Sequence, residues 1–289
     1  MANPQPPRIH STAIISPEAE LADDVQIGPY VVIAGAVRLG PGCVIRPHAT
    51  LCGPLTMGRA NQVFSGAVLG ERPQHCKYQG EPTSVAIGDD NTFRENVTVH
   101  RGTTESQTTR IGNKNYFMAG SHVGHDCQIG NRCIFANGAL TGGHCRIGDS
   151  VLLSGNCGVH QFTRIGRLAV LGAVSVSTKD IPPFIIQERI NTVVGLNLVG
   201  MRRSQIPRDA VEAVRQAYDI IFRQGQILSV ALALLEKEFG QVPPVMEMVT
   251  FIRQSKRGIN ATHHFHDSGN QVVVFRPPLK LEESFVPVA

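Results

Sequence analysis

Residues 111–171 decide the fold: IGNKNYFMAGSHVGHDCQIGNRCIFANGALTGGHCRIGDSVLLSGNCGVHQFTRIGRLAVL. Apart from one threonine, every sixth residue of this stretch is apolar: Ile111, Phe117, Val123, Ile129, Phe135, Thr141, Ile147, Leu153, Val159, Ile165 and Leu171. The next residue is often glycine, as at Gly112 and Gly130, and glycine suits tight corners that need unusual backbone angles. An apolar residue at every sixth position, with a turn in each hexad, is typical of a parallel β-helix.

The same period runs through the N-terminal part of the chain. It contributes eleven aliphatic positions: Ile9, Ile15, Leu21, Ile27, Ile33, Leu39, Ile45, Leu51, Met57, Val63 and Leu69. Residues 71–86 and 101–110 leave the pattern and return to it in frame, so each is either a run of irregular hexads or an extruded loop. The pattern resembles the hexapeptide-repeat family, whose left-handed β-helix has three hexads per triangular coil.

Composition narrows the class of protein. The chain has 289 residues, of which 42% are hydrophobic, 17% are charged and 29 are glycine. A disordered chain needs low hydrophobicity and high charge, and the glycines have no collagen triplet period. A net charge of +4 is mild for a nucleic-acid-binding protein. We therefore expect a folded protein with no nucleic-acid partner.

The cysteines indicate a reducing compartment. There are seven, with no CxxC pair, so neither disulfides nor a cysteine-based zinc site is expected. Five of them occupy the small fifth position of a hexad, where free cysteine packs as a small hydrophobe: Cys43, Cys127, Cys133, Cys145 and Cys157. Residues 1–7 do not resemble a signal peptide, and no apolar run approaches the ~20 residues of a membrane span. We expect a cytoplasmic protein without a transmembrane segment.

A change of period divides the chain into three predicted parts. Residues 1–190 form the β-helix, which carries the catalytic residues, and residues 191–258 form an α-helical C-terminal domain. Residues 259–289 are an extra tail to which we assign no function. Within the helical domain, Pro207 suits a first helical turn and Gly225 a stop.

Two further helices are expected at 226–239 and 244–257. From His160 to Asn260 the chain carries thirteen Lys and Arg against eight Asp and Glu. Such a basic region attracts acidic partners, although an ordinary solvated helical surface is the simpler interpretation.

Histidines gather on one edge of the predicted prism. With three hexads per coil, residues eighteen apart become vertical neighbours, so His125, Gly143 and Gln161 form one column. His144 and His160 lie beside that column. A lone corner histidine is more often merely solvated, whereas several on one edge favour a catalytic or binding site.

A metal site is the alternative for these histidines. Hexapeptide proteins of the γ-carbonic anhydrase type bind zinc through three histidines, two of them from one coil. The close pair in this chain, His122 and His125, has a different spacing from that family's pair. We therefore expect no metal, and no cofactor.

Six segments together resemble the UDP-N-acetylglucosamine O-acyltransferase family of lipid A synthesis. They are GEPT at 80–83, VTVHRGT at 97–103, SHVGHDC at 121–127, GNRC at 130–133, VHQF at 159–162 and Arg202-Arg203. The resemblance runs in matching order from about residue 9 to residue 258. It implies transfer of a 3-hydroxyacyl chain from acyl carrier protein to the 3-position of UDP-N-acetylglucosamine, the first step of lipid A synthesis. It also implies a homotrimer with active sites between subunits.

The resemblance assigns roles residue by residue. His125 matches the general base, Asp126 the residue that supports it, and the Gly143 amide the donor to the oxyanion. Ten positions match substrate contacts: His75, Lys77, His100, His122, His144, His160, Gln161, Asn197, Arg202 and Arg203. Arg202 and Arg203 are expected to face phosphate, while Arg164 and Arg167, with the basic cap, are expected to serve the acidic carrier protein.

Two departures from the family leave alternatives open. His75 stands where the family commonly has an aspartate near the sugar, so the acceptor group is either a 3-hydroxyl or a 3-amine. Ala173 replaces a glycine of long-chain-selective members, which predicts a shorter acyl chain. The other readings are a hexapeptide acyltransferase with another acyl donor, and a non-catalytic β-helix homologue.

Overall fold

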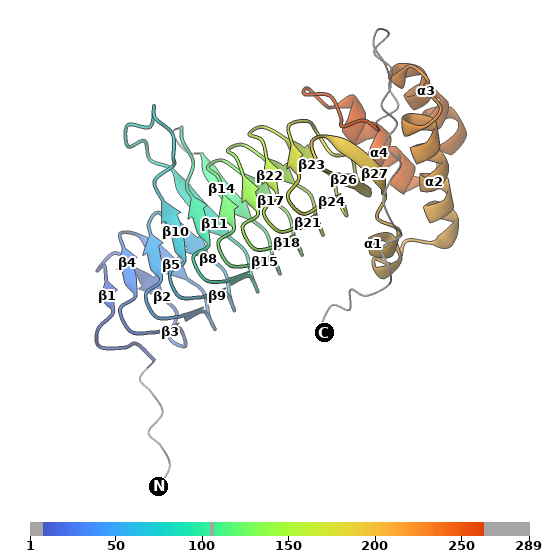
Figure 1. The fold of residues 1–289 in the computed structure, drawn as a ribbon. Coiled ribbons are helices and arrows are strands. Elements are labelled where there is room, and N and C mark those ends of the chain that lie inside the picture. The colour runs from blue at the N-terminus through green and yellow to red at the C-terminus, as the bar shows by residue number, and fades with distance from the viewer. Residues whose placement is uncertain (1–7, 105–106, 263–289) are drawn as a thin grey trace.

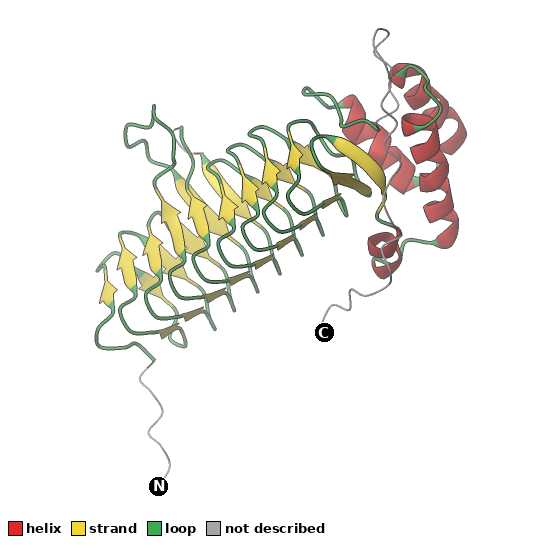
Figure 2. Cartoon of the chain, viewed as in Figure 1, coloured by secondary structure: helices red, strands yellow, loops and turns green. Residues whose placement is uncertain are grey.

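The computed structural model describes residues 8–104 and 107–262. The chain winds into a triangular prism whose three faces are β-sheets, with a group of helices at one end (Figure 1). Each coil adds one short strand to each face, and all strand pairs within the prism are parallel except the last (Figure 2). This is the parallel β-helix that the hexads predict, with the left hand that the resemblance to the hexapeptide-repeat family implies. Across the described residues, no helix is long and apolar enough to cross a membrane.

The strands fall into three faces, which we number in the order in which the chain visits them. Face 1 contains β1 (Ile14–Ile15), β4 (Val32–Ala34), β7 (Thr50–Cys52), β10 (Val68–Glu71), β13 (Thr98–His100), β16 (His122–Val123), β19 (Leu140–Thr141), β22 (Gly158–Val159) and β25 (Val176–Ser177). Face 2 contains β2 (Glu20–Leu21), β5 (Val37–Leu39), β8 (Leu55–Met57), β11 (Ser84–Ile87), β14 (Thr108–Ile111), β17 (Gln128–Ile129), β20 (Arg146–Ile147) and β23 (Arg164–Ile165). Face 3 contains β3 (Gln26–Ile27), β6 (Val44–Ile45), β9 (Gln62–Val63), β12 (Thr92–Phe93), β15 (Tyr116–Phe117), β18 (Ile134–Phe135), β21 (Leu152–Leu153), β24 (Val170–Leu171), β26 (Ile185–Glu188) and β27 (Thr192–Leu196).

The strand register matches the eighteen-residue coil in the regular part of the prism. Val123 pairs with Thr141, eighteen residues further along the chain. Leu69 instead pairs with Val99, thirty residues on, and Val99 pairs with Val123, twenty-four residues on. The additional residues form two loops, 72–83 and 101–107, between strands of face 1 and face 2. Both irregular stretches are therefore extruded loops, and both leave the prism at the same edge, which we call edge 1–2.

The apolar residues of the hexads fill the inside of the prism. Phe93, Phe117 and Phe135 are fully buried; the first two rings stack at a centroid distance of 4.9 Å, and the Phe135 ring packs tilted on Phe117 at 4.8 Å. The five cysteines of the hexads are buried, and all seven cysteines are free thiols. The small fifth position is thus a packing position, because a larger side chain there would meet the coil above or below.

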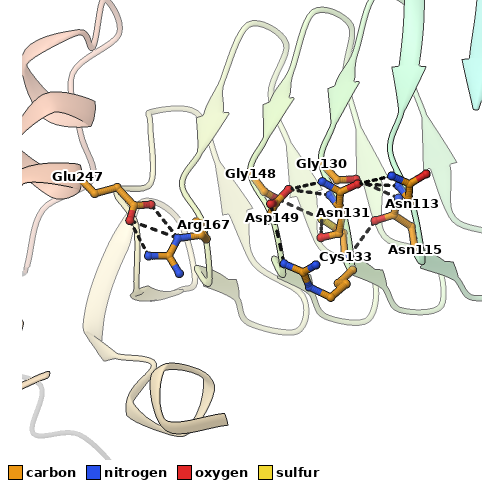
Figure 3. Close-up of polar contacts among 10 residues, drawn as sticks. Asn113, Asn115, Gly130, Asn131, Cys133, Gly148, Asp149, Arg167 and Glu247 are labelled. Atoms are coloured by element: carbon orange, nitrogen blue, oxygen red, sulfur yellow. Dashed lines mark hydrogen bonds and ion pairs between the residues drawn. The ribbon is translucent and has the colours of Figure 1, made fainter. Parts of the chain in front are cut away.

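The edge between faces 2 and 3, edge 2–3, is held by amide side chains. Asn91 and Asn115 are buried, and Oδ1 of Asn91 accepts hydrogen bonds from the backbone and side-chain N–H groups of Asn115. On the surface, Asn113 and Asn131 repeat the pattern, and Asn131 donates in turn to Asp149 (Figure 3). These ladders bond each coil to the next and satisfy the polar groups of this edge.

Four helices close the C-terminal end: α1 (Leu198–Arg203), α2 (Arg208–Phe222), α3 (Leu228–Phe239) and α4 (Pro243–Arg253). The expectation that the last helix reaches residue 257 was wrong, because the chain leaves α4 at Gln254 and returns to the prism. There Ile259 bridges to Asp180, and Asn260 is fully buried, donating to Ser177 and Gln187. The start of the predicted tail is therefore packed on the prism, and residues 263–289 lie outside the described residues. The division into two domains at residue 190 stays a prediction.

Candidate active site

Edge 1–2 positions the predicted catalytic residues. His125 lies between β16 of face 1 and β17 of face 2, His144 occupies the same corner one coil further along, and Gln161 the corner beyond that. His125, Gly143 and Gln161 thus form the column that the eighteen-residue coil predicts, and His144 lies beside it. A cavity of about 380 Å³ on this edge is lined by His100, His122, His125, Gly143, His160 and Gln161, with Gln74, Gly124, Gly142 and Val159.

His125 and Asp126 form a hydrogen-bonded pair although they are adjacent in the chain. The His125 Nδ1 atom lies 2.7 Å from Asp126 Oδ2, and both residues are only 8% exposed. The contact is possible because Asp126 has a left-handed backbone, with φ of +62°, which turns its side chain back toward its neighbour. The corner geometry thus brings the two side chains together, where an extended strand would point them to opposite sides.

Asp126 is held by two threonines that the sequence analysis did not single out. Thr103 donates to it twice, from N–H to Oδ1 at 3.1 Å and from Oγ1 to Oδ2 at 2.7 Å. The Asp126 N–H in turn donates to Thr109 Oγ1 at 2.8 Å. Burial alone would raise the pKa of Asp126, but the hydrogen bonds from His125 and Thr103 outweigh it and lower the pKa. Asp126 is therefore ionised and accepts hydrogen bonds only.

The ionised carboxylate fixes the proton on His125. Because Asp126 only accepts, Nδ1 of His125 must be the protonated nitrogen. The other ring nitrogen, Nε2, is then free to accept a proton. This is the arrangement that a general base requires.

His144 lies against the same carboxylate. Its Nε2 is 3.4 Å from Asp126 Oδ2, and its ring stacks on Phe162 at 4.5 Å. Burial lowers the pKa of His144, although Asp126 partly opposes this. His125, Asp126 and His144 could by spacing surround an ion. However, His125 Nδ1 and Asp126 Oδ2 are 2.7 Å apart, closer than the ~3.3 Å between ligand atoms on a zinc ion. Asp126 Oδ2 also accepts from Thr103, so it is part of a hydrogen-bond network as it stands.

Gly143 leaves no room for a side chain. A Cβ atom there would lie 2.6 Å from Nε2 of His125, so any other residue would displace the imidazole. Among the described residues, no hydrogen bond is formed by the Gly143 N–H. An unpaired N–H beside an imidazole is the donor that an oxyanion needs.

A second pair of histidines lies on face 1 next to this edge: His122 in β16, just before His125, and His100 at the end of β13, one coil below. The His100 and His122 rings meet edge-on at 5.0 Å, and Thr98 Oγ1 is 2.7 Å from His122 Nδ1. Burial, together with the neighbouring His100 and His125, lowers the pKa of His122 to about 4, and burial also lowers the pKa of His100. The buried Nδ1 of His100 forms no hydrogen bond within the described part of the chain. These rings are neutral near pH 7 and present uncharged polar atoms to the cavity.

The loop 72–83 carries the predicted sugar contacts over the same edge. His75 is exposed, and its ring lies 5.4 Å from that of His125 in an edge-on arrangement. Lys77 is exposed in the same loop. At the far end of the cavity, His160 Nδ1 lies 3.1 Å from the Gln161 carbonyl and 3.3 Å from Nη2 of Arg257.

Four predicted site residues lie elsewhere in the same chain. Asn197, Arg202 and Arg203 follow β27 of face 3, across the prism from edge 1–2. The Asn197 side chain caps α1 by accepting from Gly200 N and donates to Leu168 O. Ala173 is exposed at the corner between β24 of face 3 and β25 of face 1.

Arg164 and Arg167 do not face a partner protein as expected. Arg164 donates to Asp180, which is 1% exposed, and Arg167 donates to Glu247 of α4 (Figure 3). Both arginines therefore fasten the C-terminal segment to the prism, which corrects the sequence-based expectation.

Other cations line a larger cavity, of about 1340 Å³, on face 2. Arg110, Arg146, Lys256 and Arg257 border it, and none of the four forms an ion pair among the described residues. Asp126 of edge 1–2 also borders this cavity. Four cations without an ion pair among the described residues are thus located next to edge 1–2.

Fold and site together define a hexapeptide-repeat acyltransferase with a histidine–aspartate pair. Two family models match: the bacterial transferase hexapeptide repeat at residues 18–53 and 108–143, and domain 2 of UDP-N-acetylglucosamine O-acyltransferase at residues 180–260. The chain is 43% identical to the acyl-[acyl-carrier-protein]–UDP-N-acetylglucosamine O-acyltransferase of Halorhodospira halophila, over 87% of this chain and 98% of that protein. It is 44% identical to the same-named protein of Anaeromyxobacter, with the same coverage.

Solved structures agree with these relatives. LpxA from Acinetobacter baumannii superposes with a TM-score of 0.85 at 38% identity, covering 88% of this chain and 99% of that one. LpxA from Bacteroides fragilis, a UDP-N-acetylglucosamine acyltransferase, superposes with a TM-score of 0.84 at 39% identity, covering 87% and 99%. The chain belongs to the UDP-N-acetylglucosamine O-acyltransferase family.

Proposed function

We propose that this protein transfers a 3-hydroxyacyl chain from acyl carrier protein to the 3-hydroxyl of UDP-N-acetylglucosamine, the first step of lipid A synthesis. The observation that carries the proposal is the His125–Asp126 pair beside the unpaired N–H of Gly143. Base and oxyanion donor thus lie within a few ångströms of each other on one rigid edge.

The chemistry follows from these positions. His125 Nε2 takes the proton of the sugar hydroxyl as its oxygen attacks the thioester carbonyl carbon. The negative charge that forms on the carbonyl oxygen is stabilised by the Gly143 N–H, and such a donor contributes roughly 3–4 kcal/mol in comparable reactions. The intermediate collapses with cleavage of the C–S bond, and His125 returns the proton to the leaving thiolate. The products are the 3-O-acyl sugar nucleotide and the free thiol of the carrier.

An apolar stripe on face 1 suits an acyl chain. His122 pairs with Leu140, Leu140 with Gly158, and Gly158 with Val176, which bridges to Ile190. Leu140, Val176 and Ile190 are 48%, 40% and 69% exposed. Exposed apolar side chains in one line from the catalytic edge are a suitable surface for a hydrocarbon chain. The stripe ends near the corner of Ala173, which supports a role for that residue in chain length.

A homotrimer would complete the site. Asn197, Arg202 and Arg203 cannot reach edge 1–2 of their own chain, because the prism separates them. If these three residues bind the nucleotide, they bind it in the active site of a neighbouring subunit. The forked guanidinium groups would then contact the phosphates of the nucleotide. The unpaired cations beside face 2 suit the acidic carrier protein, and the free buried thiols suit a reducing cytoplasm.

Product analysis tests this function. The purified full-length chain is incubated with 3-hydroxyacyl carrier proteins and either UDP-N-acetylglucosamine or its 3-amino analogue. We expect a product that gains one hydroxyacyl mass and loses it in mild base, because an ester is cleaved there and an amide is not. A base-stable product made only from the amine would replace the proposed acceptor by the 3-amino sugar. No product from any pair would contradict the enzymatic assignment.

A further inference from the structure

Thr103 donates two hydrogen bonds to the Asp126 carboxylate from the loop between β13 and β14. The loop 101–107 leaves the prism at edge 1–2, between β13 and β14. Thr103 is 6% exposed, and both its N–H and its hydroxyl donate to Asp126, at 3.1 and 2.7 Å. A buried residue that donates two hydrogen bonds to one carboxylate fixes the position of that carboxylate.

The surrounding backbone leaves Thr103 little freedom. A Cβ atom on the preceding Gly102 would lie 2.6 Å from the Gln107 carbonyl and 2.8 Å from Asp126 Oδ1. At the other end of the loop, the hydroxyl of Thr109, itself fully buried, accepts the backbone N–H of Asp126. The two ends of the loop therefore hold Asp126 by its side chain and by its main chain.

We infer that Thr103 is a positioning residue of the acyl transfer, acting on His125 through Asp126; this rests on the proposed function. Oδ2 of Asp126 accepts from the Thr103 hydroxyl and from Nδ1–H of His125 at the same time. The hydroxyl keeps the carboxylate from rotating away from the imidazole. It also withdraws negative charge from Oδ2, which limits how strongly Asp126 holds a protonated His125.

These two effects predict a specific pattern in Thr103→Val, which keeps the shape and the N–H but lacks the hydroxyl. We expect kcat to fall about tenfold to a hundredfold, as for the loss of a hydrogen bond to a charged group, with KM for the sugar nucleotide changed less than about twofold. The acid limb of the pH–rate profile moves to higher pH, because a more negative Oδ2 stabilises the imidazolium. Thr103→Ser restores most of kcat, and the exposed neighbour variant Thr104→Val matches the wild type.

A second measurement does not depend on turnover. Nitrogen-15 NMR of labelled histidine in the full-length protein observes the Nδ1–H of His125, identified by its loss in His125→Ala. We expect this signal to shift in Thr103→Val and to return in Thr103→Ser. If the wild type catalyses no acyl transfer but the His125 signal still shifts in Thr103→Val, the proposed function fails and the positioning role of Thr103 stands. Unchanged kcat, pH profile and His125 signal in Thr103→Val, or loss of kcat with no rescue by serine, would overturn the inference.

Discussion

The corners of edge 1–2 and edge 2–3 of the prism have the same backbone conformation, but the polar groups of the two edges are used differently. The corner residues Asp126 and His144 of edge 1–2 have φ of +62° and +60°, and Arg132 and Ser150 of edge 2–3 have +55° and +56°. At edge 2–3 the asparagine ladders bond each coil to the next. At edge 1–2 the Gly143 N–H has no partner among the described residues. The repeat therefore supplies geometry, and function lies where polar groups are left for a ligand.

Replacing one carboxylate at each edge should separate these roles most strongly. In Asp126→Asn the amide can donate to His125 and favour the wrong imidazole tautomer, so we expect kcat to fall by about 10²–10⁴. The matched change, Asp149→Asn, affects a carboxylate that accepts from Asn131 in the surface ladder and lies 4.0 Å from Nη2 of Arg132. It should keep kcat within about twofold. Steady-state kinetics measures kcat of both variants, and a melting temperature checks that each is folded. Turnover of Asp126→Asn at the wild-type rate would mean that the two edges do not differ in function.

The opposite result, lost stability with unchanged kcat, is expected for a change in the buried asparagine ladder of edge 2–3. Asn115→Val removes the side-chain donor to Asn91 and Gly130 and the acceptor for Cys133 N–H. We expect about 3 kcal/mol of lost stability, because buried polar groups are left unpaired, with kcat per folded molecule unchanged. Denaturant unfolding followed by circular dichroism measures the loss, and Asn113→Ala on the exposed ladder should cost below about 1 kcal/mol. A large fall in kcat for Asn115→Val would mean that the two edges are not independent.

The His100–His122 pair predicts a pH dependence of the free energy of unfolding. Because the pKa of His122 is lowered from 6.5 to about 4, protonation favours the unfolded chain. The contribution of neutral His122 to the free energy of unfolding is complete above pH 6.5 and is lost as the pH falls toward 4. Allowing for partial exposure, the loss amounts to about 2 kcal/mol. Unfolding free energies of the wild type and His122→Gln at pH 7 and pH 4.5 test this: the variant should lose less on acidification, and parallel losses would contradict the lowered pKa.

The smallest effect is expected at the corner of Ala173. One methyl group there shortens the path of the acyl chain, and a methylene is worth about 0.8 kcal/mol, or roughly fourfold in kcat/KM. Ala173→Gly should therefore shift the preference by about that factor toward the next longer 3-hydroxyacyl donor. Ala119 occupies the same corner three coils below, so Ala119→Gly serves as the matched control. An unchanged chain-length profile in Ala173→Gly would exclude the corner from the acyl path.

Sequence alone predicts the prism and the catalytic column because both depend on a fixed period. The hexads place apolar residues inside, and a step of eighteen residues stacks Gly143 on His125. The same arithmetic fails at Thr103, since the coil there is twenty-four residues long and its loop folds back by an irregular path. A signal was present: Thr103 ends the VTVHRGT segment of the family resemblance. Nor can a period show that Arg164 and Arg167 are neutralised by Asp180 and Glu247, which are far along the chain.

On the proposed function, the chemistry of this protein depends on His125 and not on the stability of the scaffold that carries it. The most direct test is the rate of acyl transfer by His125→Ala, measured at saturating carrier protein and sugar nucleotide together with its melting temperature. We predict a loss of kcat of about a thousandfold with the melting temperature of the wild type. Turnover at the wild-type rate in this folded variant would contradict the assignment of His125 as the base.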